Sequence, residues 1–403
     1  MSSGYKGNNN YRKYNPSGYK VSSVNKGYRR KKRNLKRIRN RIIIVTAGVL
    51  IVALVIGLFS AFLKNCVCAS CNTEERVTET STVDPKATQP TTVAPSGETT
   101  PAEPVETQLD FKTPNIKDNN ASGAMKGGFF VWNNQAFESF PGTDKNTQSY
   151  ANYVNKVKKD LSEDATVYAM LVPASTEMNL PQRLKNENGL ETVSQADYIK
   201  KTYEKFKDGV IPVNCYNTLA DHCSEDIYFN TDYRWTGLGG YYGYTSFAKA
   251  ASQKVLSLSD CEEKVIKGFN GTYSTAKLPK EPIKYWDFNY DVTMDINSED
   301  GVINATSCYF DSAQEHEDSG KHIVYMQGDY HSVLKSTSPE AKGKIAIVHG
   351  SFGRMAVPYF SYNYQEVHSL NSFAFGDDIA DYCKENGITT VLFLDSVEGS
   401  MNK

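Results

Sequence analysis

KIAIVHGSFGRMAVPYF, residues 344–360, is the stretch of sequence that decides the fold. Its apolar run IAIV has the composition of a buried β-strand, and the Gly and Ser residues that follow predict a tight turn. The turn places Ser351 at the carboxyl end of the strand, where a helix is expected to begin. A serine there can act as a nucleophile beside the backbone N–H groups of a helix start, or it can simply cap the helix.

Apolar strands and amphipathic helices alternate on both sides of this stretch. Strands are predicted within residues 127–134, 165–174, 210–215, 323–328, 366–370 and 389–394. Helices are predicted from Tyr150 to Leu161, after a Ser194 cap, and over residues 377–386, where Gly387 closes the last helix. Short apolar strands separated by helices indicate an α/β fold with a parallel sheet covered on both faces.

A second strand end carries polar and aromatic residues. The loop NTDYRWTGLGGYYGY, residues 230–244, follows a short apolar strand, and ligands of such sheets bind where the carboxyl ends of the strands meet. Asp232 and Arg234 point the same way on extended backbone, so they can pair or line a pocket together. A pocket with Arg234, Tyr233 and Trp235 would suit an anionic or carbohydrate ligand. Alternatively, the ion pair is structural and Trp235 belongs to the core.

Four blocks of the sequence occur in the order found in a known family. They are MLVPASTEMNLPQRL (170–184), IYFNTDYRWTGLGGYYGYTSFAKA (227–250), KIAIVHGSFGRMAVPYF (344–360), and EVHSLN with TTVLFL (366–371 and 389–394). These blocks resemble the bacterial DHHW proteins, relatives of the AlgX/AlgJ-type alginate O-acetylation proteins of the SGNH-hydrolase-like class. The resemblance covers about Lys126 to Asp395 and implies an SGNH-hydrolase-like parallel sheet flanked by helices.

The resemblance also implies roles for individual residues. In active relatives an Asp orients a His, and the His takes the proton of a Ser nucleophile. Carried over, Asp232 and Ser351 are the catalytic residues, but Arg234 stands where the histidine belongs. A guanidinium is protonated at neutral pH and cannot accept a proton, so the general base is missing. Gly350 also replaces the acidic residue that precedes the serine in the family.

Another histidine can be considered as a substitute base. His349 lies two residues before Ser351 and therefore on the same face of the predicted strand, and His331 lies in the loop GDYHSV. Either ring would need to reach the serine hydroxyl and to have an orienting partner. The other histidines have the sequence surroundings of surface or loop residues: His222, His316, His322 and His368.

The first 122 residues differ in composition from a folded domain. Residues 1–41 carry 14 Lys and Arg and no acidic residue, which predicts a basic disordered cytoplasmic tail. Residues 42–63 are uncharged and long enough to span a membrane, and the adjoining cations predict a single-pass type II orientation. Residues 64–122, rich in Thr, Pro and Glu, predict a disordered extracellular stalk. Residues 123–403 then form the SGNH-hydrolase-like extracellular domain.

The basic tail and the cysteines each allow more than one interpretation. A cleaved secretory signal is disfavoured because its basic region would be unusually long and no clean cleavage pattern follows. Membrane topology and attraction to anionic lipid already explain the charge, so we expect no nucleic-acid partner. The eight cysteines show no metal-site spacing, and a bridge between Cys215 and Cys223 stays open. We expect no metal and no cofactor.

These observations lead to two main hypotheses of function. The first is a degenerate, non-catalytic protein of the cell envelope that binds cell-wall or exported polysaccharide or serves the envelope acetylation machinery as an accessory. The second is an active O-acetyl esterase or acetyltransferase with Ser351 as nucleophile. In both, the N-terminal helix contacts membrane lipid. A purely structural surface protein would explain the stalk but not the residues of the predicted cleft.

Overall fold

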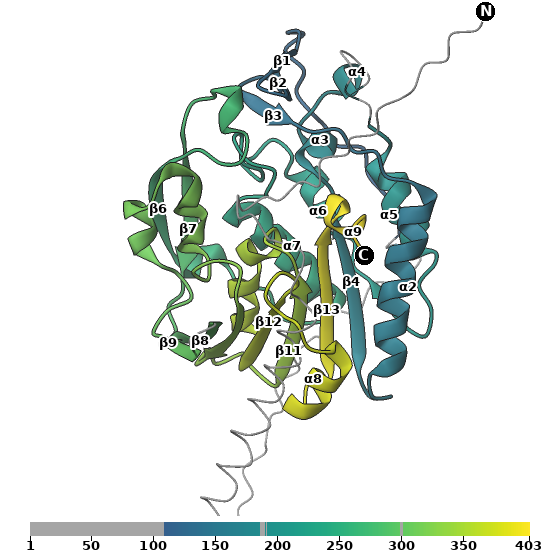
Figure 1. Cartoon of the computed structure of the whole chain (residues 1–403), viewed down its shortest axis with the longest axis vertical. Helices are drawn as coiled ribbons and strands as arrows, with labels where there is room; N and C mark the ends of the chain where they lie inside the picture. The colour runs from purple at the N-terminus through teal and green to yellow at the C-terminus, as the bar shows by residue number, and fades with distance from the viewer. Residues whose placement is uncertain (1–108, 186–189, 191, 299–300) are drawn as a thin grey trace, which may run out of the picture. The chain divides into compact units, whose positions relative to one another are not determined.

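An eight-stranded mixed sheet organises the part of the chain that the computed structural model describes, residues 109–185, 190, 192–298 and 301–403 (Figure 1). Its order is β5 (Ile211–Pro212), β4 (Thr166–Val172), β13 (Thr390–Ser396), β11 (Lys344–His349), β12 (Glu366–Asn371), β10 (His331–Ser336), β8 (Val292–Ser298) and β9 (Gly301–Ala305). Neighbours from β5 to β12 pair in parallel, and those from β12 to β9 pair antiparallel. The predicted parallel sheet is therefore its larger part.

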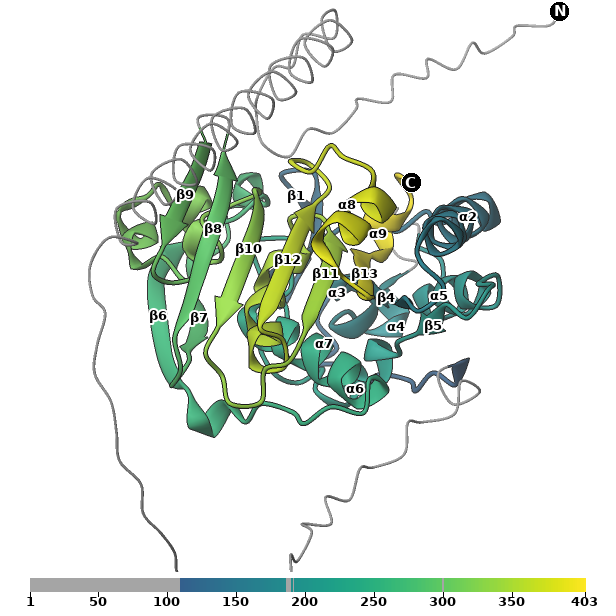
Figure 2. The same ribbon diagram turned by 90° about the horizontal axis from the view of Figure 1, so that it is seen from below.

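Helices cover both faces of the sheet. Figure 2 shows α8 (Ile379–Asn386) on one face, with α6 (Cys215–Asp221) and α7 (Gly237–Ala250) on the other. The long α2 (Asp144–Asp160) contacts both α8 and α5 (Gln195–Tyr203). The central strands β4, β11 and β13 are buried almost along their whole length, as strands covered on both faces must be. The expected α/β architecture with flanking helices is confirmed.

Local sequence signals set several helix ends as predicted. The hydroxyl of Ser194 accepts a hydrogen bond from the Asp197 N–H and caps α5. Gly387 ends α8 with a left-handed φ of 64°, a conformation that glycine adopts without strain.

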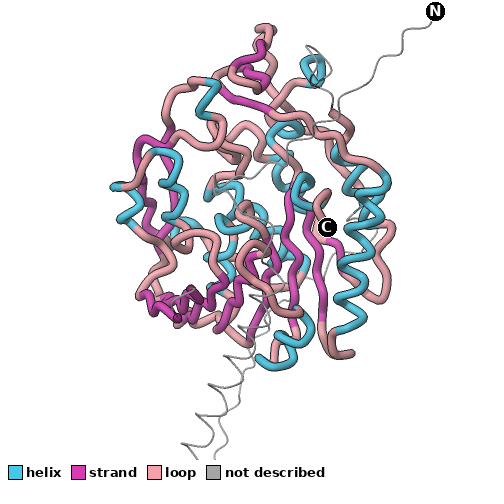
Figure 3. Tube along the Cα trace, viewed as in Figure 1, coloured by secondary structure: helices cyan, strands magenta, loops and turns pink. Residues whose placement is uncertain are grey.

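Smaller elements complete the described region, and cyan helices and magenta strands alternate along the trace in Figure 3. The strands β1 (Ala124–Lys126), β2 (Phe129–Trp132) and β3 (Gln135–Phe137) form one small sheet, and β6 (Glu262–Phe269) pairs with β7 (Glu281–Asp287). Short helices are α3 (Ser175–Met178), α4 (Gln182–Lys185) and α9 (Val397–Ser400). The 3-10 helices are η2 (Leu258–Asp260), η3 (Ser274–Ala276), η4 (Asp311–Glu315), η5 (Asp318–Val324), η6 (Gly353–Met355) and η7 (Val357–Tyr362).

Two predicted elements are wrong. Residues 323–328 do not form a strand, because η5 extends to Val324 and the backbone then turns through left-handed Met326 and Gln327 and through Gly328, at φ 119°. Two consecutive left-handed residues are incompatible with an extended strand. The segment after Ser351 forms η6 and η7 rather than an α-helix. The sequence reasoning also missed the antiparallel strands β8 to β10.

The predictions for the N-terminal part concern mostly residues that the structure does not describe. The predicted tail, membrane span and stalk up to residue 108 lie outside the described residues. Within the described ranges, no helix is both long and apolar enough to cross a membrane. The end of the predicted stalk touches the domain, since Phe111 packs edge-on against Tyr216 of α6. Cys215 and Cys223 are both free thiols, so the bridge left open by the sequence is not formed.

Candidate functional site

Ser351 lies in the turn that follows β11, and only 4% of its surface is exposed. Its hydroxyl oxygen is 2.7 Å from the phenol oxygen of Tyr233. Arg234 donates to the same hydroxyl from Nη2 at 3.4 Å. No other hydrogen bond to this hydroxyl occurs within the described part of the chain. The two predicted strand ends, far apart in the sequence, therefore meet at Ser351.

Asp232 and Arg234 form a buried ion pair beside the serine. Arg234 Nη1 lies 2.8 and 2.9 Å from the two carboxylate oxygens of Asp232, and the Arg234 backbone N–H donates to Oδ1 at 3.0 Å. Burial alone would lower the pKa of Arg234, but the neighbouring carboxylate outweighs it and raises the pKa above its ordinary value. Arg234 is therefore a permanent cation in contact with the serine hydroxyl.

The loop that carries this ion pair is anchored by residues that sequence reasoning missed. Glu281 of β7 accepts hydrogen bonds from the backbone N–H groups of Asn230 and Thr231. The Thr272 N–H donates to Asp232 Oδ2 at 2.9 Å. Gly271 leaves room for this contact, because a Cβ on it would lie 2.4 Å from that oxygen. Nothing in the sequence pattern marks these residues, since each acts through a contact distant along the chain.

Tyr233 and Trp235 differ in their access to a ligand. Trp235 is fully buried, stacks on Phe352 and donates its indole N–H to the Phe352 carbonyl, so it belongs to the core rather than to a ligand-facing surface. Tyr233 contacts Ser351 directly. Burial raises the pKa of the Tyr233 phenol, although the Arg234 cation partly opposes that effect. The phenol therefore stays protonated at neutral pH and does not serve as a general base.

Neither histidine considered as a substitute base contacts the serine hydroxyl. His349 Nδ1 donates to the Gly350 carbonyl at 2.7 Å, and Nε2 lies 2.7 Å from Ser369 Oγ. Burial lowers the pKa of His349 to about 4, so the ring is neutral and both nitrogens are engaged. His331 directs Nε2 to the hydroxyl of Tyr382 at 3.0 Å. The geometry gives no support to rescue by either ring.

His368 lies elsewhere than expected from the sequence, whereas His322 in η5 is half-buried. His368 is buried in β12 and hydrogen-bonds Tyr382, so it is not a surface residue. Burial holds the pKa of His322 well below the ordinary value, and the cations of Arg354 and Arg234 lower it further. His322 is therefore a neutral ring close to two arginines.

Arg354 is a second buried arginine at the site, and the sequence analysis did not single it out. Its Nε lies 3.0 Å from Asp329 Oδ1 and 3.4 Å from the Ser351 carbonyl oxygen. Burial lowers the pKa of Arg354, Asp329 partly offsets that effect, and Arg234 lowers the pKa further. The signal available in the sequence was its position three residues after the serine.

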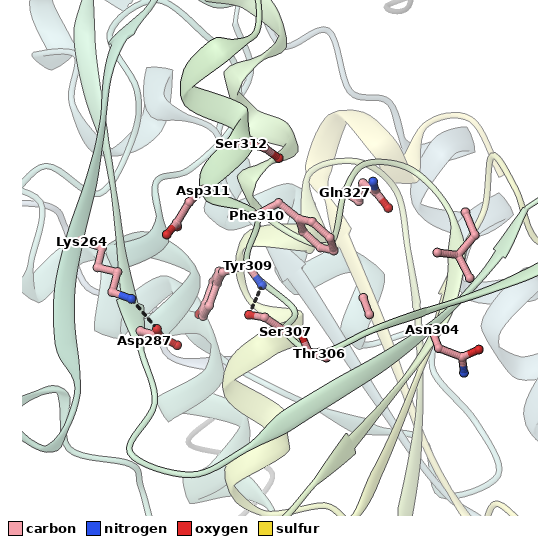
Figure 4. Close-up of a pocket in the computed structure, with 12 residues that line it drawn as sticks. Lys264, Asp287, Asn304, Thr306, Ser307, Tyr309, Phe310, Asp311, Ser312 and Gln327 are labelled. Atoms are coloured by element: carbon pink, nitrogen blue, oxygen red, sulfur yellow. Dashed lines mark hydrogen bonds and ion pairs between the residues drawn. The ribbon is translucent and has the colours of Figure 1, made fainter.

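A cavity of about 550 Å³ lies in another part of the domain (Figure 4). Lys264 and Asp287 pair across one side of it at 2.7 Å, and Asn304 and Gln327 line other parts. Its lining includes none of the residues around Ser351. Within the described ranges, no group of three or more His, Cys, Asp or Glu side chains is placed to hold a metal ion.

Comparisons with known proteins bear on the family and the fold of this chain. Residues 74–370 match the family model described as DHHW protein. A solved DHHW family protein from Eubacterium siraeum is 24% identical with a TM-score of 0.62, over 70% of this chain and 95% of that one. Bacillus cereus PatB1, solved with a sulfonyl adduct, is 17% identical with a TM-score of 0.56, over 70% and 96%. The O-acetyltransferase domain of Pseudomonas putida AlgJ is 11% identical with a TM-score of 0.42, over 70% and 92%. No curated protein sequence matches the chain.

Proposed function

This chain belongs to the DHHW protein family, and we propose that it binds polysaccharide at the cell envelope through an SGNH-hydrolase-like site that no longer catalyses acyl transfer. One observation carries the proposal: Arg234 Nη2 lies 3.4 Å from the Ser351 hydroxyl, where the family resemblance expects a histidine. A guanidinium donates hydrogen bonds but accepts no proton, so the serine is not activated.

The immediate surroundings of the serine support the loss of catalysis. Asp232, the orienting acid of the resemblance, is bound on both oxygens by Arg234. His349 is neutral and engaged on both nitrogens, and the raised pKa of Tyr233 keeps its phenol protonated. His349 and Tyr233 are therefore each held in a state that does not deprotonate the hydroxyl.

The polysaccharide ligand and the envelope location rest on sequence. The uncharged segment 42–63 and the 14 cations before it favour a type II anchor with the domain outside the membrane. A stalk of Thr, Pro and Glu would hold the domain away from the bilayer, within reach of wall or exported polymer. Cytosolic acyl donors would not reach a domain in that place.

An active O-acetyl esterase or acetyltransferase remains the second candidate. The observation that favours it is the contact between the loop of Asp232 and the turn of Ser351, which brings Asp232, Arg234 and Ser351 together. This candidate needs a base other than Arg234, Tyr233, His331 and His349.

Restoring the two family residues tests the proposal. The double variant Arg234→His with Gly350→Asp returns the base and the acid, and Gly350 has space for a side chain because its Cβ would meet only ordinary contacts at 3.7 and 3.9 Å. We expect hydrolysis of a chromogenic acetyl ester by this variant at least about 100-fold above the wild-type chain, since general base catalysis contributes roughly that much.

A matched control separates restored chemistry from nonspecific hydrolysis. The triple variant that adds Ser351→Ala should lose the gained activity, and both variants should melt within a few degrees of the wild type. Wild-type turnover that falls on Ser351→Ala alone would instead establish the active enzyme and remove the proposal.

A further inference from the structure

We propose that Arg354 binds an anionic group, a carboxylate or a phosphate, on the polymer that occupies the Ser351 site. This inference rests on the proposed function and names the class of ligand. It starts from hydrogen-bond donors that the protein itself leaves without acceptors.

Arg354 is 1% exposed, and neither Nη1 nor Nη2 has a hydrogen-bond partner in the described structure. Its one ion pair, to Asp329, uses Nε. The Nε of Arg234 is also buried without a partner. A buried donor left without an acceptor destabilises the protein, because it has lost its hydrogen bonds to water. A guanidinium edge with both terminal nitrogens unpaired has the geometry that binds a carboxylate or phosphate with two parallel hydrogen bonds.

The charge balance around Ser351 agrees with an anionic ligand. Arg234 is neutralised by Asp232 in a pair with both side chains almost fully buried. The partner of Arg354 is different, because 37% of the Asp329 side chain is exposed and water weakens its effect on the buried cation. Burial lowers the pKa of Arg354, and Arg234 lowers it further. Asp329 raises this pKa, but it does not outweigh the other two effects. The positive charge of Arg354 is therefore the less compensated of the two.

Two exposed aromatic rings lie near the site, one beside Gly350 and one beside Gly328. Phe373 is 66% exposed, and its ring lies 3.7 Å from the Cβ position of Gly350, the residue before Ser351. Tyr330 is 40% exposed, and a Cβ on Gly328 would lie 3.7 Å from its ring and 3.8 Å from Arg354 Nη1. Aromatic faces at the rim of a site suit the apolar faces of sugar rings. Trp235 is buried and cannot contact a sugar ring, so we assign that contact to Phe373 and Tyr330.

The turn of Met326 to Gly328 lies beside the guanidinium of Arg354. Its two left-handed residues, Met326 and Gln327, are followed by Gly328 next to Arg354 Nη1. Such backbone strain gathers at ligand clamps and movable loops. Because Arg354 is buried in this structure, an anion reaches the Nη atoms only when neighbouring residues move.

The test measures dissociation constants of the full-length chain by calorimetry. The probes are an oligogalacturonate, a glycerol phosphate oligomer and a neutral malto-oligosaccharide of equal length. We expect at least one anionic probe to bind the wild type about tenfold or more tightly than the neutral one. Arg354→Met should weaken that binding about 10- to 100-fold. Arg354→Lys should restore part of the binding because lysine keeps the positive charge. The restoration should be incomplete because lysine lacks the planar fork of a guanidinium. The tighter anionic probe identifies the source of the charge.

Controls distinguish a binding role of Arg354 from a structural one. Arg183→Met removes an arginine paired with Asp118 on the surface and should leave all dissociation constants unchanged. Phe373→Ala should weaken neutral and anionic probes alike. Without ligand, Arg354→Met should melt no lower than the wild type, because it removes two unpaired donors and leaves Asp329 partly in water.

The outcomes separate this inference from the proposed function. Equal affinity of the wild type for anionic and neutral probes, or unchanged binding by Arg354→Met, overturns the role of Arg354 while polysaccharide binding stands. A lower melting temperature of Arg354→Met with unchanged binding likewise makes Arg354 a structural residue. Turnover that depends on Ser351 removes the proposed function itself.

Discussion

Arg234 contacts the acid, the serine and the tyrosine of the site. It forms an ion pair with Asp232, approaches Ser351 and stacks over the ring of Tyr233 with its central carbon 4.4 Å from the ring centre. Those contacts are the ones that a catalytic histidine would make with acid and nucleophile, yet the cation accepts no proton. A position can thus keep its contacts and lose its reaction.

Gly271→Ala tests how tightly the site loop is held. A Cβ at this position would lie 2.4 Å from Asp232 Oδ2, which is closer than real atoms approach. The carboxylate must shift, and the Thr272 and Arg234 hydrogen bonds to it shift with it. We expect the free energy of unfolding, measured by urea titration, to fall by about 1 to 3 kcal/mol, as overpacking usually costs.

A second glycine in the domain provides the matched control. Gly376 has no atom within 4 Å of its Cβ position, and its φ does not exclude a side chain. Gly376→Ala should therefore change the free energy of unfolding by less than about 0.5 kcal/mol. Equal stability of the two variants would show that the loop around Asp232 is looser than described.

The C-terminal helix α9 carries a carboxyl whose protonation is linked to stability. The pKa of Glu398 is raised to about 7 from its ordinary 4.5, because burial disfavours the charged form and Glu138 repels it. The unfolded chain releases this proton near pH 4.5 and the folded chain near pH 7. Stability contributed at low pH is therefore lost as the pH rises through that window. Glu398→Gln should raise the melting temperature at pH 8 and leave it nearly unchanged at pH 4.

A carboxylate outside this environment serves as the comparison. Glu163 is exposed in the loop between α2 and β4, and Glu163→Gln removes the same charge from the domain. Its melting temperature should differ from the wild type by a similar amount at both pH values. A Glu398→Gln shift of equal size at pH 4 and pH 8 would contradict the assignment.

The sequence predicted the elements whose signals are local. The capped helix after Ser194, the glycine end of α8 and the apolar strands β4, β11 and β13 all follow from residues that lie within a few positions of one another. The antiparallel strand β8 was missed although its burial alternates along the strand, a pattern typical of one solvated face. The turns after Ser351 were misjudged because their 3-10 geometry depends on tertiary packing.

The sequence predicted the residues that contact Ser351 from the 230–244 loop, but it did not predict the residues that support them. Asp232, Arg234 and Ser351 were found through motif order, and the structure brings them together. Glu281 and Arg354 were not found, because they act through contacts that only the fold creates. Trp235 belongs to the core, which is one of the two interpretations that the sequence allowed, and it is buried there by stacking on Phe352.

At the scale of the whole molecule, the proposed anchor sets what the domain can meet. Residues 1–41 are strongly basic, and the remainder of the chain carries all 46 acidic residues. In intact bacterial protoplasts that express the full chain, added proteinase K should degrade the C-terminal domain and spare the N-terminal tail, as detected with antibodies to each end. Replacing the Lys and Arg residues of 26–41 by Asn should weaken that orientation. A protected domain in the wild-type chain would contradict the type II topology.

The central claim is that Ser351 is not an activated nucleophile, and intact-mass spectrometry after treatment with phenylmethylsulfonyl fluoride tests it most directly. The reagent sulfonylates a serine only when its hydroxyl is activated as a nucleophile. We expect an unchanged mass for the wild-type chain and one sulfonyl adduct for the double variant Arg234→His with Gly350→Asp. A sulfonyl adduct on Ser351 of the wild-type chain would contradict it.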